Sequence, residues 1–238
     1  MSISSECSVV ITGGSKGIGW AIAKVFARDT DHPIVLIARN EEDLITAKKE
    51  LIRLGAVSVQ WFVADVSKEK EIATIPFDTL NPGVLVNNAG HFLFKKLEHT
   101  SPDEFEAQFR VNTLSAFLMA SYCLPFMVKQ DQGLIVSISS RAGLVGFDNC
   151  GAYAMSKHAL NGYMRSLRKE WYGRNLSVTT INLGQTYSNS WAGSTVDPKT
   201  LINPEDVGLI IKDLTRLSPQ SVAEEMTIMP QGGEVAPF

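Results

Sequence analysis

The sequence predicts an α/β fold, a doubly wound parallel sheet of about seven strands with helices on both faces. Short apolar segments alternate along the chain with longer amphipathic segments, which is the strand–helix order of a parallel sheet. Most of the short segments are rich in Val and Ile and lack polar alternation, as expected of strands buried on both faces. The 238 residues contain no low-complexity linker and no internal repeat, so we expect a single domain, residues 1–238.

The expected elements follow one another in a regular order. The strands are expected at Ser8–Ile11, Ile34–Ala38, Ser58–Val63, Val84–Val86, Leu134–Ile138, Ser177–Ile181 and Met226–Met229. The helices are expected at Ile18–Arg28, Glu41–Leu54, Pro102–Val128, Ala152–Tyr172 and Pro204–Arg216. Two helix starts are marked by their sequence, Ser101–Glu104 and Asn203–Asp206. Each offers an N-cap residue, a proline at the first helical position and carboxylates in the first turn.

Composition and charge exclude several classes of protein. The net charge of −3 gives no basic footprint for nucleic acid, and no apolar run approaches the roughly 18–20 residues that span a bilayer. The N-terminus lacks the basic region of a signal peptide. The three cysteines are widely spaced, and the four histidines show no metal-ligand spacing. We therefore expect a cytoplasmic protein with reduced thiols, no metal, and no nucleic-acid or membrane partner.

A glycine-rich loop, TGGSKGIG, ends the first strand and opens the first helix. Gly13 allows a tight turn, Gly17 lets backbone N–H groups approach a pyrophosphate, and Gly19 lets the helix pack closely on the strand. No Gly-Lys-Ser/Thr closes the motif, which excludes a P-loop. The alternative is a glycine-rich turn without a ligand, but a position after the first strand of a β-α-β unit favours dinucleotide binding.

The end of the second strand indicates which dinucleotide binds. A site for NAD usually places an acidic side chain there, facing the ribose 2′-hydroxyl. This chain has Ala38 at that place, followed by Arg39, and it has Lys16 in the glycine loop. Two cations and no carboxylate suit the 2′-phosphate of NADP. The alternative is that Arg39 is a solvated residue before the next helix.

Together with this loop, NNAG at Asn87–Gly90 and the set of Ser140, Tyr153 and Lys157 resemble the short-chain dehydrogenase/reductase family. The resemblance runs from Val9 to about Pro230, and it implies a Rossmann-like fold. Each motif alone is modest, but their order and placement are specific. Within the family, the chain is similar to 3-oxoacyl-carrier-protein reductases and to sepiapterin-type carbonyl reductases.

The resemblance implies roles at matching positions. The catalytic set is Asn112, Ser140, Tyr153 and Lys157, in which the serine stands thirteen residues before the tyrosine. With the glycine loop and Arg39, the expected cofactor-binding set is Gly13, Ser15, Lys16, Gly17, Ile18, Gly19, Arg39, Asp65, Val66, Asn87, Ala89, Gly90, Tyr153, Lys157, Gly184 and Ser188. The family has Pro-Gly where this chain has Leu183–Gly184, and Thr where it has Ser188.

The spacing of Tyr153 and Lys157 places both on one helix face. A nearby ammonium and an oxidised nicotinamide favour phenolate, so we expect them to lower the tyrosine pKa from its usual value near 10. In carbonyl reduction, Tyr153 gives its proton to the carbonyl oxygen while NADPH delivers hydride to the carbon. Ser140 stabilises the developing oxyanion. Lys157 also holds the nicotinamide ribose, and Asn112 binds a water that joins the proton relay.

The sequence therefore predicts an NADP-dependent oxidoreductase that reduces ketones or aldehydes, with secondary alcohol oxidation as the reverse reaction. Two alternatives remain, a non-catalytic dinucleotide-sensing protein on the same fold and an NAD-dependent alcohol dehydrogenase. The family implies a homodimer or homotetramer formed through the two long helices.

The substrate is a small molecule that the sequence leaves unnamed. Loops after the fourth, fifth and sixth strands supply the candidate substrate-binding residues His91, Arg141, Phe147 and Trp191. The alternative for the aromatic residues is ordinary core or interface. Arg141 either meets an anionic substrate group or is a surface arginine. A short substrate loop is expected near 189–202.

Overall fold

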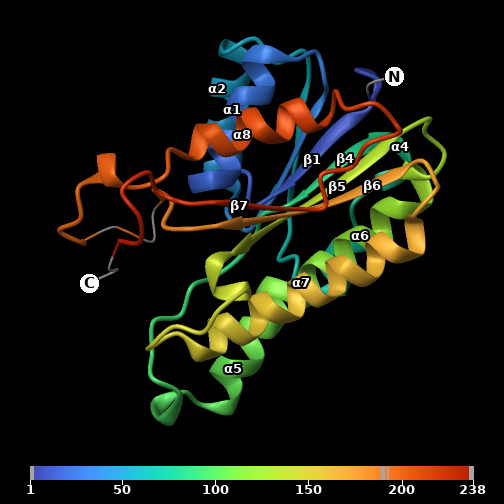
Figure 1. The fold of residues 1–238 in the computed structure, drawn as a ribbon. Helices are drawn as coiled ribbons and strands as arrows, with labels where there is room; N and C mark the ends of the chain where they lie inside the picture. The colour runs from blue at the N-terminus through green and yellow to red at the C-terminus, as the bar shows by residue number, and fades with distance from the viewer. Residues whose placement is uncertain (1–2, 189–190, 192, 236–238) are drawn as a thin grey trace.

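The computed structural model describes residues 3–188, 191 and 193–235. Its centre is a seven-stranded parallel sheet with the order β3-β2-β1-β4-β5-β6-β7 (Figure 1). The strands are β1 (Ser8–Thr12), β2 (Ile34–Ala38), β3 (Val59–Val63), β4 (Pro82–Asn87), β5 (Gly133–Ser140), β6 (Leu176–Leu183) and β7 (Glu225–Ile228). The predicted fold class and all seven strands are confirmed, with differences of at most two residues at either end.

Helices cover both faces of the sheet (Figure 1). One face carries α1 (Gly17–Asp29), α2 (Glu41–Arg53) and α8 (Pro204–Leu214), and the other carries α5 (Pro102–Phe109), α6 (Ser115–Met127) and α7 (Gly151–Trp171). Each face has its own buried apolar cluster, and successive strand residues feed alternate clusters. Val9 and Ile11 of β1 point into the cluster under α1, whereas Val10 points into the cluster under α6 and α7.

Shorter elements complete the chain. Two helices that the sequence did not predict, α3 (Glu69–Ile72) and α4 (Phe77–Leu80), connect β3 to β4. They are too short to show a helical period. Single 3₁₀ turns lie at η1 (Leu97–His99), η3 (Arg141–Gly143) and η5 (Pro198–Thr200).

The single helix expected at Pro102–Val128 is interrupted. Between α5 and α6 the chain forms a π-helical segment, η2 (Arg110–Leu114). Such segments often occur at functional sites. Here the π turn contains Asn112, whose buried side chain bonds to neighbouring loops. The interruption therefore has a tertiary cause that helical periodicity does not reveal.

Both predicted helix starts are confirmed. Ser101 and Glu104 form a reciprocal capping box at the start of α5, and Asn203 caps α8 by accepting from the Glu205 N–H at 3.1 Å. Asn40 caps α2 in the same way.

The strand order fixes where a ligand crevice can form. From β1 the chain builds outward to β3, then crosses back to β4 on the other side of β1. The carboxyl ends of β1 and β4 therefore flank the point where the winding reverses, which is where parallel α/β sheets bind ligands.

No helix in the described part of the chain is long and apolar enough to span a bilayer. Within the same residues, no group of three or more His, Cys, Asp or Glu side chains could hold a metal ion. The three cysteines are buried and unpaired with one another.

Close packing of α8 on α1 depends on Gly208. A Cβ at this position would lie 2.8 Å from Cγ2 of Val25 and 3.2 Å from the Ile22 Cα. We expect Gly208→Ala to lower the free energy of unfolding by about 1–2 kcal/mol, because overpacking outweighs the gain in helix propensity. The matched control is Gly162→Ala in α7, where no atom lies within 4 Å, and it should raise the free energy by about 0.5–1 kcal/mol. Urea denaturation measures both, and equal effects would contradict the packing argument.

Candidate active site

The glycine loop between β1 and α1 adopts a conformation that only glycine takes easily. Gly13 and Gly17 have φ values of 64° and 56°, in the left-handed region. At Gly19 a Cβ would lie 2.4 Å from both the Gly13 carbonyl oxygen and Nδ2 of Asn88. The loop therefore folds back tightly on itself and on the end of β4.

Thr12 and Asn88 hold this loop in place. Oγ1 of Thr12 accepts hydrogen bonds from the backbone N–H groups of Asn88 and Ala89, both at 3.0 Å. Nδ2 of Asn88 donates to the Thr12 carbonyl at 2.9 Å. Neither residue was among the predicted site residues. Asn88 lies inside the NNAG motif, but nothing in the sequence pairs it with Thr12.

The N-terminus of α1 is suited to an anion. Its N-cap, Lys16, makes no side-chain capping bond, and no acidic residue lies in the first turn. By contrast, α2, α5 and α8 all have side-chain caps and acidic first turns. The N–H groups and the positive end of the α1 dipole therefore remain available to phosphate oxygens. Ser15 and Ile18, both half-buried, belong to the same loop.

The ends of β2 and β3 carry the predicted charged residues. Arg39 is exposed at the end of β2, and Lys16 pairs with Asp43 at 2.8 Å. Asp65, after β3, accepts hydrogen bonds from the N–H and hydroxyl of Ser67. Burial acts to raise the pKa of Asp65, but these bonds and the charges of Lys68 and Arg39 lower it overall. Asp65 is therefore an ionised acceptor near Arg39, and Val66 is buried beside it.

The ends of β4 and β6 complete the predicted cofactor set. Asn87 is buried and donates to the Ser137 hydroxyl at 3.3 Å, and its Oδ1 has no hydrogen-bond partner. A Cβ at Gly184 would lie 2.9 Å from Sδ of Met229, so the glycine is needed there even without the family's proline. A Cβ at Gly17 would lie 3.6 Å from the Ser188 Cβ, so these two loops approach each other.

Ser140, Tyr153 and Lys157 meet at the end of β5. The Ser140 Oγ accepts from the Ala142 N–H at 3.1 Å and lies close enough to the Tyr153 hydroxyl to act on its pKa. One helical turn further on, the Lys157 Nζ donates to the Ile138 carbonyl at 2.9 Å and lies 5.7 Å from the Tyr153 ring centroid. The edge-on ring of Phe92 lies 5.0 Å from that of Tyr153 and shields one side of it.

Asn112 is tied to the loop after β4. Its Oδ1 accepts from the His91 N–H at 2.8 Å, and its Nδ2 donates to the His91 carbonyl at 3.0 Å. Nδ2 also lies within hydrogen-bond distance of Gln108 Oε1 and Ser156 Oγ. A Cβ at Gly90 would lie 2.9 Å from Oδ1 of Asn112 and 3.7 Å from Nζ of Lys157. Asn112 and Lys157 therefore flank Gly90, and sequence reasoning did not find Gln108 or Ser156.

The two titratable groups have shifted pKa values. Burial raises the pKa of Tyr153 to about 12, although the hydrogen bond with Ser140 acts in the opposite direction. Burial lowers the pKa of Lys157 to about 8. The sequence led us to expect a lowered tyrosine pKa, but in the protein alone desolvation dominates and Lys157 bonds to a carbonyl instead. Tyr153 is consequently a neutral phenol at neutral pH, the form that donates a proton.

The predicted substrate residues are less closely grouped. His91 is exposed, with its Nδ1 2.9 Å from Nε2 of Gln108. Phe147 and Trp191 are half-buried, and the Trp191 indole donates to the Thr186 carbonyl at 3.0 Å. Of the expected loop 189–202, residues 189, 190 and 192 lie outside the described residues. Only Arg141 is adjacent in sequence to the Ser140–Tyr153 pair.

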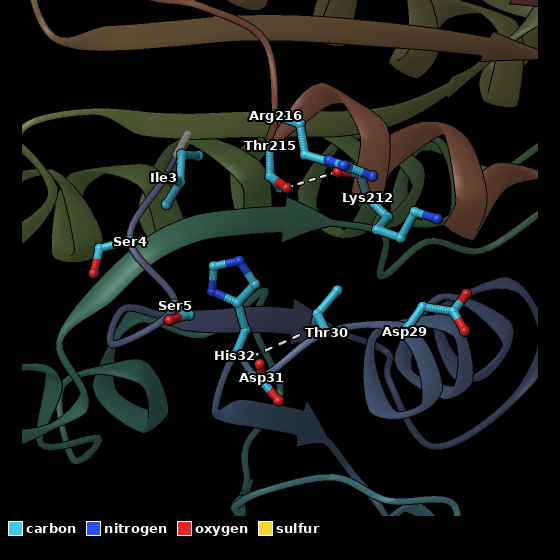
Figure 2. Close-up of a pocket in the computed structure, with 10 residues that line it drawn as sticks. All are labelled: Ile3, Ser4, Ser5, Asp29, Thr30, Asp31, His32, Lys212, Thr215 and Arg216. Carbon is cyan, nitrogen blue, oxygen red and sulfur yellow. Dashed lines mark hydrogen bonds between the residues drawn. The ribbon is translucent and has the colours of Figure 1, made fainter. Parts of the chain in front are cut away.

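A separate hollow of about 520 Å³ lies at the amino ends of the strands (Figure 2). Its lining includes the N-terminal segment, His32 before β2 and Lys212 of α8. His32 is buried there, with its Nδ1 2.9 Å from the Cys7 carbonyl oxygen. None of the predicted site residues lines this hollow, and it has no contact with the Ser140–Tyr153 pair.

Comparison with known proteins identifies the family. The short chain dehydrogenase family model matches residues 8–198, so the chain belongs to this family and is an oxidoreductase. An uncharacterised oxidoreductase of Thermotoga maritima is 32% identical over 92% of this chain and 86% of its own length. Sepiapterin reductase of Chlorobaculum tepidum is 27% identical over 95% of this chain and 97% of its own. The resemblance found in the sequence is thereby confirmed.

Solved structures agree with this assignment. An alcohol dehydrogenase of Thermococcus sibiricus, complexed with 5-hydroxy-NADP, has a TM-score of 0.87 at 26% identity and covers 97% of this chain and 99% of its own. A 3-oxoacyl-[acyl-carrier protein] reductase of Brucella melitensis, with bound NAD, has a TM-score of 0.85 at 26% identity and covers 96% and 91%. A dinucleotide cofactor is therefore supported, and both NAD and NADP occur among the neighbours.

Burial of the charged Lys157 ammonium lowers the free energy of unfolding. Its pKa is lowered in the folded state, so the penalty is fully present below about pH 8 and disappears as pH rises toward 10.5, where the unfolded lysine also loses its proton. The shift corresponds to about 3 kcal/mol, offset in part by the lost bond to Ile138 in a variant. We expect Lys157→Met to raise the free energy of unfolding at pH 7 by about 1–2 kcal/mol.

The advantage of Lys157→Met over wild type should shrink as the pH rises above 8 and change sign near pH 10, because the wild type recovers more than about 2 kcal/mol over this range. Urea denaturation at several pH values measures it, with exposed Lys48→Met as a control that changes stability by at most about 0.5 kcal/mol. A Lys157→Met protein that is less stable than wild type at every pH would contradict the expectation.

Proposed function

We propose that the protein is an NADP-dependent oxidoreductase that transfers hydride between NADPH and a ketone or aldehyde carbonyl. The observation that carries this proposal is the approach of the Ser140 hydroxyl to a half-buried, neutral Tyr153 at the carboxyl end of β5, with Lys157 one helical turn away. A carbonyl oxygen that accepts from both hydroxyls is polarised by Ser140 and receives its proton from Tyr153. The bound dinucleotide supplies the hydride.

Lys157 and Asn112 position these groups. Lys157 has its ammonium fixed on the Ile138 carbonyl, from where it stabilises the phenolate that forms as Tyr153 loses its proton. We assign to it the nicotinamide ribose as well. Asn112 holds the His91 backbone and so keeps Gly90 open beside the lysine. A side chain larger than hydrogen at Gly90 would fill this space.

The residues present fit a dinucleotide. We propose that the uncapped end of α1 and the glycine loop hold the pyrophosphate, with Asp65 accepting from the adenine amino group. Asn87, with an unpartnered buried oxygen, lines the central part of the cofactor. Ser188 faces Gly17 and is assigned to the nicotinamide amide.

Preference for NADP rests on Arg39. It is exposed at the end of β2, and Ala38 before it offers no carboxylate to a ribose 2′-hydroxyl. Its planar guanidinium suits a 2′-phosphate. Lys16 already pairs with Asp43, so Arg39 is the more effective partner. The Thermococcus sibiricus neighbour named for an NADP derivative supports this preference.

The role of Tyr153 is tested by Tyr153→Phe. We expect a loss of turnover of about 10²- to 10⁴-fold, because the proton donor is removed, with NADPH binding and thermal stability retained. NADPH oxidation is measured against ketones, diketones, pterins and 3-oxoacyl thioesters. Tyr163→Phe, a half-buried tyrosine of the same helix, is the control and should keep full activity. Retention of more than a tenth of the activity in Tyr153→Phe would overturn the mechanism, and NADPH binding without turnover by wild type would favour a dinucleotide sensor.

The cofactor preference is tested by Arg39→Asp. We expect kcat/KM with NADPH to fall about 10- to 100-fold and kcat/KM with NADH to rise, because a carboxylate repels the 2′-phosphate and accepts from a 2′-hydroxyl. Lys16→Ala should have a smaller effect, since Lys16 is already paired. An unaltered ratio of the two efficiencies in Arg39→Asp would rule out NADP recognition by this residue.

A further inference from the structure

Arg141 directly follows Ser140, yet its guanidinium is almost unused. Its side chain is 36% exposed, and its one ion pair places Nε 3.7 Å from Oε1 of Glu234, beyond hydrogen-bond distance. Among the described residues no hydrogen bond reaches the guanidinium, so its five N–H donors have no acceptor in the protein. Two arginines of α7 differ: Arg165 bonds twice to Glu225, and Arg168 bonds to the Val178 carbonyl.

The carboxylate near Arg141 comes from the end of the chain. After β7, Met229 and Pro230 pack beside Gly184. The chain then continues at the carboxyl ends of the strands (Figure 1) and brings Glu234 near Arg141. The Glu234 side chain is 51% exposed. An ion pair this exposed contributes little to stability, so a stronger acceptor displaces it easily.

Of the other cations in these loops, Lys96 and Lys199 are exposed and lie far from Ser140 in the sequence. The Lys95 ammonium bonds to both carboxylate oxygens of Glu104, at 2.7 and 2.8 Å, and Lys157 is fixed on the Ile138 carbonyl. Asp148 is exposed and lies close enough to Cys150 to add to the rise in the pKa of that thiol, which burial mainly causes. Arg141 is thus the cation directly beside Ser140 that has donors to offer a ligand.

We propose that Arg141 binds an anionic group of the substrate, a carboxylate or a phosphate a few bonds from the carbonyl, and that Glu234 takes this place in the free protein. The inference rests on the proposed function of the same site. Ser140 ends β5 and Arg141 begins η3, with Cα atoms about 3.8 Å apart, and on this adjacency we assign both side chains to one small molecule. The guanidinium fork matches both carboxylate and phosphate oxygens, and partial burial strengthens its electrostatic attraction to them.

The test compares anionic carbonyl compounds with neutral partners of the same skeleton. Acetoacetate is paired with methyl acetoacetate, and dihydroxyacetone phosphate with dihydroxyacetone. For each pair, the ratio of kcat/KM for the anion to kcat/KM for the neutral partner is measured by NADPH oxidation. We expect wild type to favour the anion of at least one pair, and that pair distinguishes carboxylate from phosphate recognition.

Two variants then locate the effect. Arg141→Met should lower the anion-to-neutral ratio about 10- to 100-fold, the loss expected for a charge-assisted bidentate contact. Glu234→Gln should raise kcat/KM for the anion about 2- to 5-fold, because the competing charge is gone, and leave the neutral partner unchanged. Arg53→Met, which removes an exposed charge at the end of α2, should leave the ratio unaltered.

An unaltered ratio in Arg141→Met, or an equal fall for both members of a pair, overturns the inference. If the neutral ketones are still reduced when such a result is obtained, this inference fails but the proposed function stands. If wild type reduces neither member of either pair nor any compound of the broader carbonyl panel, the proposed function fails, and this inference fails with it.

Discussion

The hydrogen bond from the Lys157 ammonium to the Ile138 carbonyl is the contact on which the candidate site depends. It joins α7 to β5 at 2.9 Å. Lys157 lies four residues after Tyr153 in the helix, and Ile138 lies two residues before Ser140 in the strand. Because helix and strand are fixed to each other there, the tyrosine hydroxyl meets the serine hydroxyl. The same contact requires a buried cation, which the fold tolerates only because the remaining packing around it is close.

That packing includes a polar layer behind Ser140. Asn161, one turn beyond Lys157, donates to the Gly143 carbonyl and to Oδ1 of Asn182, both at 3.0 Å. A Cβ at Gly143 would lie 2.8 Å from Nδ2 of Asn161 and 2.9 Å from the Lys157 carbonyl. The turn after Ser140 is thus clamped between α7 and β6. A clamped turn keeps the serine hydroxyl in one position, which suits a group that must meet a developing oxyanion.

The sequence predicted what depends on local pattern. Apolar runs located all seven strands, cap residues located the starts of α5 and α8, and ordered motifs brought Ser140, Tyr153 and Lys157 together. It missed what depends on tertiary contact. The π segment at Asn112, the pairing of Thr12 with Asn88 and the carboxylate of Glu234 near Arg141 each join residues far apart in the chain. The direction of the Tyr153 pKa shift was not predicted correctly from the sequence either, because burial, which raises this pKa, outweighs the effect of a neighbouring charge. The cofactor-binding residues and the oligomer remain predictions.

Three features at the carboxyl edge of the sheet are of a kind that a ligand would satisfy. The uncapped end of α1, the buried ammonium of Lys157 and the unpartnered Oδ1 of Asn87 all lie at the carboxyl ends of β1, β4 and β5. By contrast, α2, α5 and α8 begin with side-chain caps and acidic first turns. The N–H groups of α1 and the Asn87 oxygen are groups that a phosphate and a ribose hydroxyl would satisfy, and Lys157 still has N–H groups to donate beside its bond to Ile138. These groups support the proposed dinucleotide site, and Arg141 extends the same argument to the substrate.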